Sequence, residues 1–405
     1  MKWEKVKLGD LAICIQPGPF GSQLHSSDYA DEGTPIIMPK DMIDGKISQK
    51  DLIRVPDKHL QRLKRHQVFD GDLMVARKGD VRKCVYITKN ENGWLTGSDC
   101  LKVSLDKEKC FPKYIYYQLR SPFMGRWLET ISIGATMPSL NTGLLSGIEI
   151  FLPTIEEQKR IAGILSAYDS LIENNQEQIK LLEEAAQRLY KEWFVDLRFP
   201  DYETTPIVDG VPEGWSMCTA GNVIEFNPKT PLKKGCIKQS VPMTALSTSS
   251  MVLNSSEFTM TESNSGAKFR NGDTLLARIT PCLENGKTAF VAGITSEEGA
   301  VGSTEFIVMR AKKINPYMVY LLARTEEFRK TAINSMTGSD GRQRAQVDKI
   351  MQFPYLLAPQ STLEAFSQLV EPIFEQVYLK NSQIAQLSQA RDRLLPKLMS
   401  GEIEV

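Results

Sequence analysis

Few residues of this chain stand in arrangements that could carry out covalent chemistry. Gly286-Lys287-Thr288 ends like a phosphate-binding loop, but Pro281 occupies the place of its first glycine, so we interpret the segment as a turn between strands. His25, His59 and His66 share no spacing with one another or with a cysteine that would suggest a metal site. We therefore expect neither a phosphate-binding loop nor a metal centre.

Missing motifs also argue against an enzyme. The sequence contains no Gly-x-Ser-x-Gly, no His-Glu-x-x-His and no Gly-x-Gly-x-x-Gly motif. It also lacks the Asn/Asp-Pro-Pro-aromatic motif expected of an adenine methyltransferase. The sequence predicts a binding protein that holds no cofactor of its own, and a stand-alone DNA-modifying enzyme is kept as an alternative.

The cysteines show no pattern of a metal or disulfide framework. All seven lie far apart and none forms a Cys-x-x-Cys pair, which argues against a zinc knuckle and against a secreted disulfide scaffold. We expect them to be buried thiols. They are Cys14, Cys84, Cys100, Cys110, Cys218, Cys236 and Cys282.

Polar and cationic side chains on loops could instead read DNA bases and grip phosphates. Both halves of the chain offer such loops between short β-type runs. In the first half the candidate DNA-binding residues are Gly21, Ser22, Lys40, Arg77, Lys78, Arg82, Lys83, Thr136, Ser139 and Asn141. In the second half they are Lys229, Arg278, Thr280, Lys287, Arg342, Gln343 and Arg344. For any single one of them, a solvated loop position is the alternative.

The two halves repeat one another. Gly-Asp, a short apolar run and Ala-Arg occur at 71–77 and again at 272–278. Tyr114–Leu119 matches Tyr317–Leu322, and Gly97-Ser98 matches Gly302-Ser303, in the same order and at nearly the same offset. We infer a duplication. Because it places Arg77 and Arg278 at the same point of each half, these two are the favoured base or phosphate contacts, with a structural ion pair as the alternative.

Each half is predicted to be a mixed α/β domain followed by a long helix, so the fold class is α+β. Short β-type runs broken by Gly, Pro and Asn give way to a strongly helical stretch in both halves. We predict these domains at 1–152 and 201–357, a central helix at 153–200 and a C-terminal helix at 358–405. The breaker-rich segment 199–206 separates the halves.

Both helices carry start signals. Thr154 precedes Glu157, and Ser361 precedes Glu364, at the spacing of a capping box. Pro372 interrupts the second helix, where we expect a kink.

An apolar seam with heptad spacing predicts that the two helices pair as an antiparallel coiled coil. The first seam is Ile161, Leu165, Tyr168, Ile172, Asn175, Ile179, Leu182, Ala186, Leu189 and Trp193. The second is Leu363, Phe366, Val370, Ile373, Val377, Asn381, Ile384, Leu387, Leu394 and Leu398.

One asparagine lies near the centre of each seam. We predict that Asn175 and Asn381 meet and set the helix register, the alternative being that both are solvated on a helix flank. A helix of this length spans ~60 Å and could act as a ruler between two domains in pseudo-two-fold arrangement, which would face DNA half-sites about one helical turn apart.

The bulk composition suits a soluble multidomain protein. Of the 405 residues, 41% are hydrophobic and 24% are charged, and no stretch is long and apolar enough for a membrane span. The first residues carry no apolar signal core, so we expect a cytoplasmic protein without a membrane partner. Net charge is zero overall, although residues 1–152 hold 22 basic and 18 acidic groups, an excess of four positive charges.

The whole chain resembles the specificity subunits of type I restriction-modification systems. The resemblance rests on the two divergent domains and on three helical motifs: Leu152–Ala162, Arg188–Phe194 and Leu394–Ile403. It implies two target recognition domains that each read one half of a split, asymmetric double-stranded DNA target. It further implies two methyltransferase subunits docked on the helices, and it allows for two ATP-dependent restriction subunits. S-adenosylmethionine and ATP would then bind to those partners.

The chain departs from the family pattern in its second helix. The start at Ala358-Pro359-Gln360-Ser361 is looser than the first, and Pro372 follows. These departures put in doubt how symmetrically two methyltransferases would bind. A coiled-coil adaptor whose globular domains bind protein is the alternative function.

Overall fold

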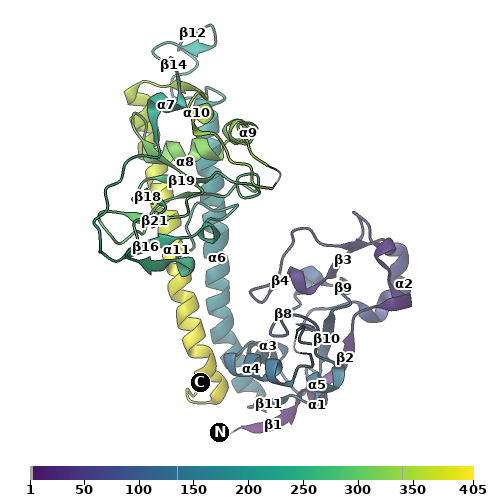
Figure 1. The fold of residues 1–405 in the computed structure, drawn as a ribbon. Helices are drawn as coiled ribbons and strands as arrows, with labels where there is room; N and C mark the ends of the chain where they lie inside the picture. The colour runs from purple at the N-terminus through teal and green to yellow at the C-terminus, as the bar shows by residue number, and fades with distance from the viewer. Residues whose placement is uncertain (1–2, 135, 340) are drawn as a thin grey trace. The chain divides into compact units, whose positions relative to one another are not determined.

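A computed structural model describes residues 3–134, 136–339 and 341–405 (Figure 1). It divides into two compact units. Unit 1 comprises Met1–Leu171 and Gln386–Val405, and unit 2 comprises Ile172–Ala385.

Unit 1 is built around a four-stranded antiparallel sheet of order β2-β10-β7-β8. Its inner strand β7 consists entirely of buried apolar residues, as the run Leu-Met-Val-Ala predicts. A second sheet has the order β6-β3-β9, and β1 pairs with β11 and β4 with β5. The strands are β1 (Glu4–Lys7), β2 (Ala12–Pro17), β3 (Thr34–Ile37), β4 (Met42–Ile43), β5 (Lys46–Ile47), β6 (Arg54–Val55), β7 (Leu73–Ala76), β8 (Cys84–Tyr86), β9 (Leu95–Thr96), β10 (Cys100–Leu105) and β11 (Glu149–Leu152).

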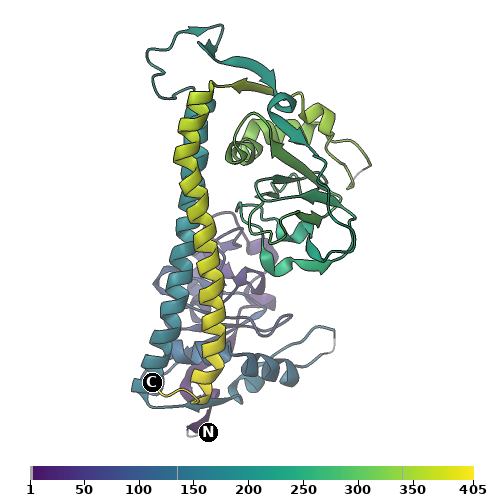
Figure 2. The same ribbon diagram turned by 90° about the vertical axis from the view of Figure 1, so that its left-hand side faces the viewer.

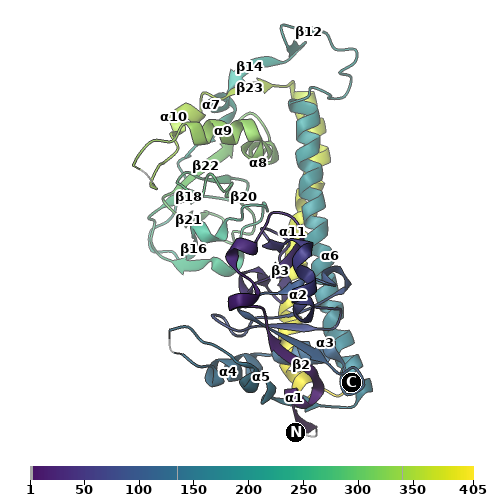
Figure 3. The ribbon, with the colours of Figure 1, turned by 90° about the vertical axis from the view of Figure 1, so that its right-hand side faces the viewer.

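Short helices connect the strands of unit 1, several of which are labelled in Figure 3. Proline at the first helical position starts both α3 and α4, and the hydroxyl of Ser121 caps α4 by accepting from the amide of Met124 at 3.3 Å. The helices are α1 (Leu8–Leu11), α2 (Leu60–Leu63), α3 (Pro112–Leu119), α4 (Pro122–Ile131) and α5 (Thr142–Ser146).

Unit 2 repeats this plan, in agreement with the predicted duplication. Its sheet β15-β22-β19-β20 has the same order as β2-β10-β7-β8, and the parallel pair β16 with β21 corresponds to β3 with β9. The strands are β12 (Ile207–Val208), β13 (Val211–Pro212), β14 (Ser216–Thr219), β15 (Ile224–Phe226), β16 (Lys238–Val241), β17 (Thr259–Thr261), β18 (Ala267–Phe269), β19 (Thr274–Ala277), β20 (Thr288–Phe290), β21 (Ala300–Gly302), β22 (Phe306–Ala311) and β23 (Pro354–Leu357). The short helices are α7 (Ala220–Val223), α8 (Pro316–Arg324), α9 (Glu326–Asn334) and α10 (Val347–Ile350).

Two long helices, α6 (Ile155–Phe194) and α11 (Gln360–Ser400), complete the fold (Figure 2). The predicted capping box at the start of α6 is confirmed, because Thr154 and Glu157 exchange side-chain to backbone hydrogen bonds of 3.0 and 3.3 Å. The second predicted capping box is wrong. α11 already begins at Gln360, which places Ser361 inside the first turn, and Glu364 accepts instead from the side chain of Gln360 at 2.9 Å.

Within each unit, part of α6 packs against part of α11 in antiparallel sense. In unit 1, Ile161 and Leu165 share a core with Leu395 and Leu398. In unit 2, the rings of Tyr190, Trp193 and Phe194 surround Phe366. Most of the predicted seam residues are buried, which is the reason for their heptad spacing. α11 continues unbroken through Pro372.

The asparagine register stays a prediction. Tyr190 and Phe366 are in contact, with ring centroids 6.1 Å apart, and each lies 15 positions from its asparagine. Antiparallel pairing therefore brings Asn175 and Asn381 to about the same level of unit 2. Asn175 is buried and Asn381 half-buried, and no hydrogen bond joins them among the described residues.

The cysteine prediction was only partly right. Cys84, Cys100 and Cys110 are buried, but Cys236 is exposed and the remaining three are half-buried. No helix in the described part of the chain is long and apolar enough to cross a bilayer.

Candidate nucleic-acid interface

The duplicated arginines hold the same backbone position in their two domains. Arg77 directly follows β7, and its amide donates to the carbonyl of Asp99 at 2.7 Å. Arg278 directly follows β19, and its amide donates to the carbonyl of Glu305 at 2.9 Å. The carbonyl of each arginine then accepts from the amide of a later residue, Leu140 or Ala345, at 2.8 Å. The strand ends are thus built alike, each with an acidic residue beside the arginine.

The two guanidinium groups have different surroundings. Arg77 lies over the exposed ring of Phe20, 5.4 Å from its centroid. Arg278 is half-buried, and its Nε atom has no hydrogen-bond partner within the described structure. Neither takes part in an ion pair among the described residues, and both can therefore still accept an anionic partner. Their role in DNA contact remains a prediction.

The neighbouring acidic residues bind other cations. Lys78 Nζ lies 3.3 Å from Asp99, and Arg344 approaches Glu305 to 2.6 Å with several hydrogen bonds. The hydrogen bonds from Arg344 lower the pKa of Glu305 despite its partial burial. Lys78 and Arg344 are about half exposed, so each can also turn toward a phosphate.

Two matching loops stand next to the arginines. In unit 1, Ile133 and Ser139 exchange two backbone hydrogen bonds of 2.9 Å, and Gly134, Thr136 and Met137 between them are exposed at a loop tip. In unit 2, Thr337 and Arg344 do the same at 3.1 and 2.9 Å. Exposed Thr136 lies in the first tip, and positions 135 and 340 are outside the described residues. Each tip is tied to the segment after its arginine, through Gly79 to Pro138 and through Thr280 to Gln343.

Some predicted contact residues have structural partners. Lys83 Nζ donates to the carbonyl of Pro39, and Lys287 Nζ donates to that of Met243, both at 2.9 Å. The two lysines occupy equivalent places and each holds a short 3-10 helix. Asn141 caps α5 by accepting from the amide of Leu144 at 2.8 Å.

The other candidates are mostly exposed. Arg82 pairs with Asp80 at 2.9 Å and with Glu129 at 3.3 Å. Lys40, Lys229 and Arg342 are exposed, Gln343 and Thr280 are half-buried, and Gly21 and Ser22 lie in a 3-10 helix. Nothing is described of the Ser22 side chain.

Sequence reasoning missed a cavity in each domain. The cavity of unit 1, about 320 Å³, is lined by Gln16, Pro17, Gly18, Phe20, Gln23, Arg65 and His66. The cavity of unit 2, about 260 Å³, includes Asn227, Pro228, Lys268, Arg278 and Thr304 in its lining. Both lie at the end of the first strand of the four-stranded sheet. The sequence feature that could have pointed to the first cavity is the glycine at positions 18 and 97. In the structure the two approach so closely that a Cβ on Gly18 would lie 1.9 Å from the carbonyl oxygen of Gly97.

Comparison with known proteins points to one group of relatives. Residues 1–184 match the family model for the type I restriction modification DNA specificity domain. The type I restriction enzyme MjaIX specificity subunit of Methanocaldococcus jannaschii is 28% identical over 332 residues, which cover 79% of this chain and 75% of that protein. Over most of its length the chain is similar to type I restriction-modification specificity subunits.

Other specificity subunits are similar to parts of the chain or to its fold. The EcoAI specificity subunit of Escherichia coli is 32% identical over 171 residues, or 40% of this chain and 28% of that protein. The crystal structure of a type I S subunit from M. genitalium has a TM-score of 0.58 at 15% identity and covers 98% of this chain and 96% of that chain. The shared fold confirms the predicted α+β class with two mixed domains and two long helices. Specificity subunits are the non-catalytic members of their systems, which agrees with the predicted absence of an enzyme activity.

Proposed function

We propose that this specificity subunit reads a bipartite, asymmetric double-stranded DNA sequence, one half with each recognition domain. The observation that carries the proposal is the duplicated strand end. An arginine that forms no ion pair with the described residues, an acidic neighbour and an exposed loop tip recur at the same place in two domains of one plan. Duplicated domains with diverged loops suit a target whose halves differ in sequence.

The subunit acts by directing its partners. Two methyltransferase subunits bind the helical regions and methylate adenine within the recognised sequence. Where the system contains them, two ATP-dependent restriction subunits join the complex. S-adenosylmethionine and ATP bind to those partners, since this chain contains no motif for either.

The deciding experiment is to map adenine methylation by long-read sequencing. DNA would be compared from cells that express this chain with its neighbouring methyltransferase and from cells that lack only this chain. A split motif present only with the chain is the expected result, and it would give both half-sites and the gap between them. If binding to the methyltransferase is shown but no motif depends on this chain, the DNA-reading proposal is wrong and a protein-binding adaptor is favoured.

A further inference from the structure

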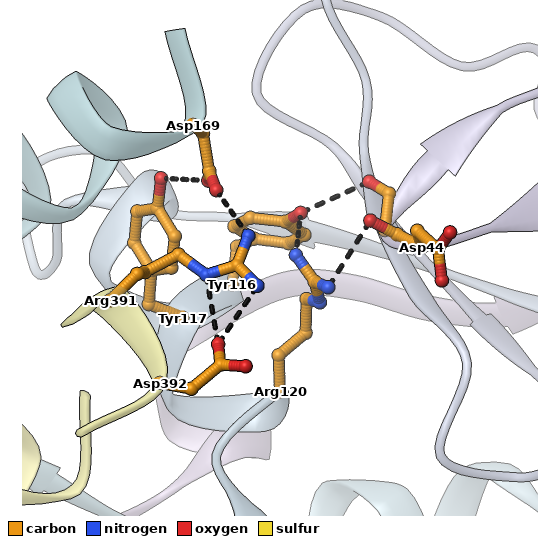
Figure 4. Close-up of polar contacts among 8 residues, drawn as sticks. Asp44, Tyr116, Tyr117, Arg120, Asp169, Arg391 and Asp392 are labelled. Carbon is orange, nitrogen blue, oxygen red and sulfur yellow. Dashed lines mark hydrogen bonds and ion pairs between the residues drawn. The ribbon is translucent and has the colours of Figure 1, made fainter. Parts of the chain in front are cut away.

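One polar cluster in unit 1 joins α3, α6 and α11 (Figure 4). The hydroxyl of Tyr117 on α3 donates to Asp169 on α6 at 2.6 Å. Arg391 on α11 donates to the other oxygen of the same carboxylate at 2.8 Å and also to Asp392. The side chains of Asp169 and Arg391 are only 15% and 20% exposed. A charge pair across the two helices is thus largely removed from water.

Stability alone does not account for such a pair. Removing two charges from water is costly, and apolar side chains of similar volume often stabilise a buried site as well or better. The attested advantage of a buried polar pair is that it specifies which partner or register a helix accepts. The duplicated second unit shows what an apolar version of this junction looks like.

The two long helices can be aligned residue by residue. Ile161 and Leu165 of α6 correspond to Phe366 and Val370 of α11, each 205 positions later, and all four are buried. The same offset relates Trp193 near the end of α6 to Leu398 near the end of α11, which are also buried.

At this offset the charged pair has an apolar counterpart. Phe374 stands where α6 has Asp169, and Ala186 stands where α11 has Arg391. Both are buried in the core of unit 2, at 1% and 0% exposure. Phe374 packs against Tyr320 of α8, the counterpart of the α3 tyrosine, with ring centroids 5.8 Å apart. One junction is therefore charged and its duplicate is apolar.

This difference between the two junctions disfavours pairing of a long helix with its own copy in a second chain. Because the helices descend from one repeat, α6 could pair with α6 of a second copy, and α11 with α11. The first pair would place Asp169 beside Ala186, and the second would place Arg391 beside Phe374. The first pair leaves the buried Asp169 carboxylate without its cation, and the second leaves the Arg391 guanidinium with only its neighbour Asp392, so both lose the charge pair across the helices and are unfavourable. We propose that Asp169 and Arg391 are positioning residues that select the pairing of α6 with α11 over self-pairing between copies.

The test uses full-length chains with two different affinity tags. Asp169→Arg alone would place two arginine side chains face to face at the junction of α6 and α11. Arg391→Asp alone would place two aspartate side chains face to face there. Co-expressed, the two variants can satisfy both junctions only by pairing α6 of one chain with α11 of the other. Residues 195–215, which join α6 to β14, provide the connection across which such an exchange can occur. We expect the mixed pair to co-purify at least tenfold more than two wild-type chains.

Three further variants complete the test. Both changes in one chain should restore the wild-type monomer. The control co-expresses Glu177→Arg and Arg393→Asp, two charge reversals at exposed helix positions, on separate tagged chains. This pair should co-purify no more than two wild-type chains do. Asp169→Phe with Arg391→Ala copies the apolar junction and should fold, but it should exchange chains with a tagged copy of itself.

Two results would overturn the proposal. One is a mixed pair that co-purifies no more than wild type although the double reversal folds normally. The other is an apolar copy that folds and remains as monomeric as wild type. Neither result depends on DNA recognition, so the proposed function is tested separately.

Discussion

At the scale of single residues, Arg77 and Arg278 show what duplication preserved. Their backbone hydrogen bonds match, yet one guanidinium lies over Phe20 and the other is half-buried beside a cavity. Equal backbone positions with different surroundings are expected of two sites that read different sequences.

We predict that Arg77→Ala and Arg278→Ala each weaken recognition of one half-site only. If the lost contact is to a base, discrimination at one position should fall by ~1–3 kcal/mol, whereas a lost phosphate contact should weaken binding to all sequences and reduce the salt dependence. Binding of the assembled complex to DNA variants at several salt concentrations distinguishes the two. Arg62→Ala, at an exposed ion pair with Asp28, serves as the control.

A second residue prediction uses the matched aspartates Asp72 and Asp273. Asp273 is 1% exposed and pairs with Arg310 at 2.7 Å, while the Asp72 carboxylate accepts a hydrogen bond from the amide of Phe69 at 2.9 Å and forms no salt bridge with the residues that the structure describes. Asp273→Ala should therefore cost ~3–5 kcal/mol because it leaves a largely buried guanidinium unpaired. Asp72→Ala should cost ~1–2 kcal/mol, the loss of one hydrogen bond. Hydrogen exchange of the backbone amides in β19 and β7 measures the two losses of stability. Equal losses would contradict the predicted difference between the two aspartates.

The buried ring of His66 predicts a pH dependence. Burial, assisted by the nearby Arg65 guanidinium, lowers the pKa of His66 to about 4, below its ordinary value of 6.5. The folded protein therefore favours the neutral ring, so this contribution to stability is complete above pH 6.5 and is lost as the pH falls toward 4. The loss should approach ~3 kcal/mol. Urea unfolding, followed in unit 1 across this pH range, should show a weaker dependence of stability on pH in His66→Gln. His25→Gln, a change at an exposed position, should keep the wild-type dependence.

At the scale of elements, the two long helices show that a helix start depends both on its local sequence and on how the rest of the chain packs. Both have heptad seams, which are mostly buried in α6, whereas in α11 half of the seam residues are buried and half are intermediate. Their starts differ, because Thr154 caps α6 whereas Ser361 lies inside the first turn of α11. A spacing that forms a cap in one helix need not do so in its duplicate, since the cap also requires the chain to leave the helix at that residue.

The starts of the helices give a matched prediction. Thr154→Ala should destabilise the protein by ~1 kcal/mol, because it removes an acceptor for an unpaired amide of the first turn. Ser361→Ala should change stability by no more than a few tenths of a kcal/mol, since alanine favours a helix interior. Thermal unfolding of the two variants provides the comparison, and a larger loss in Ser361→Ala would contradict the observed helix start.

At the scale of the whole molecule, the predicted domain boundaries can be tested by exchange. Replacing residues 1–152 with the equivalent segment of another family member should change one half of the methylated motif and leave the other half and the gap intact. The reason is that each half carries its own sheets, loop tip and arginine. Mapping methylation in cells with the hybrid measures this, and a change in both halves would refute a split target.

Patterns within the sequence alone determined the helices, the inner strands, the duplication and the absence of catalytic motifs. These features arise from contacts between residues close in the sequence or from the repetition within the chain. They can therefore be predicted from the amino-acid sequence alone. Only the tertiary structure decided that Lys83, Lys287 and Asn141 have structural partners, and that Arg278 and Phe20 each line a cavity. It also decided that Asp169 meets Arg391, 222 positions away. Such contacts depend on how distant segments pack, and many sequences with the same local pattern would bring different side chains together.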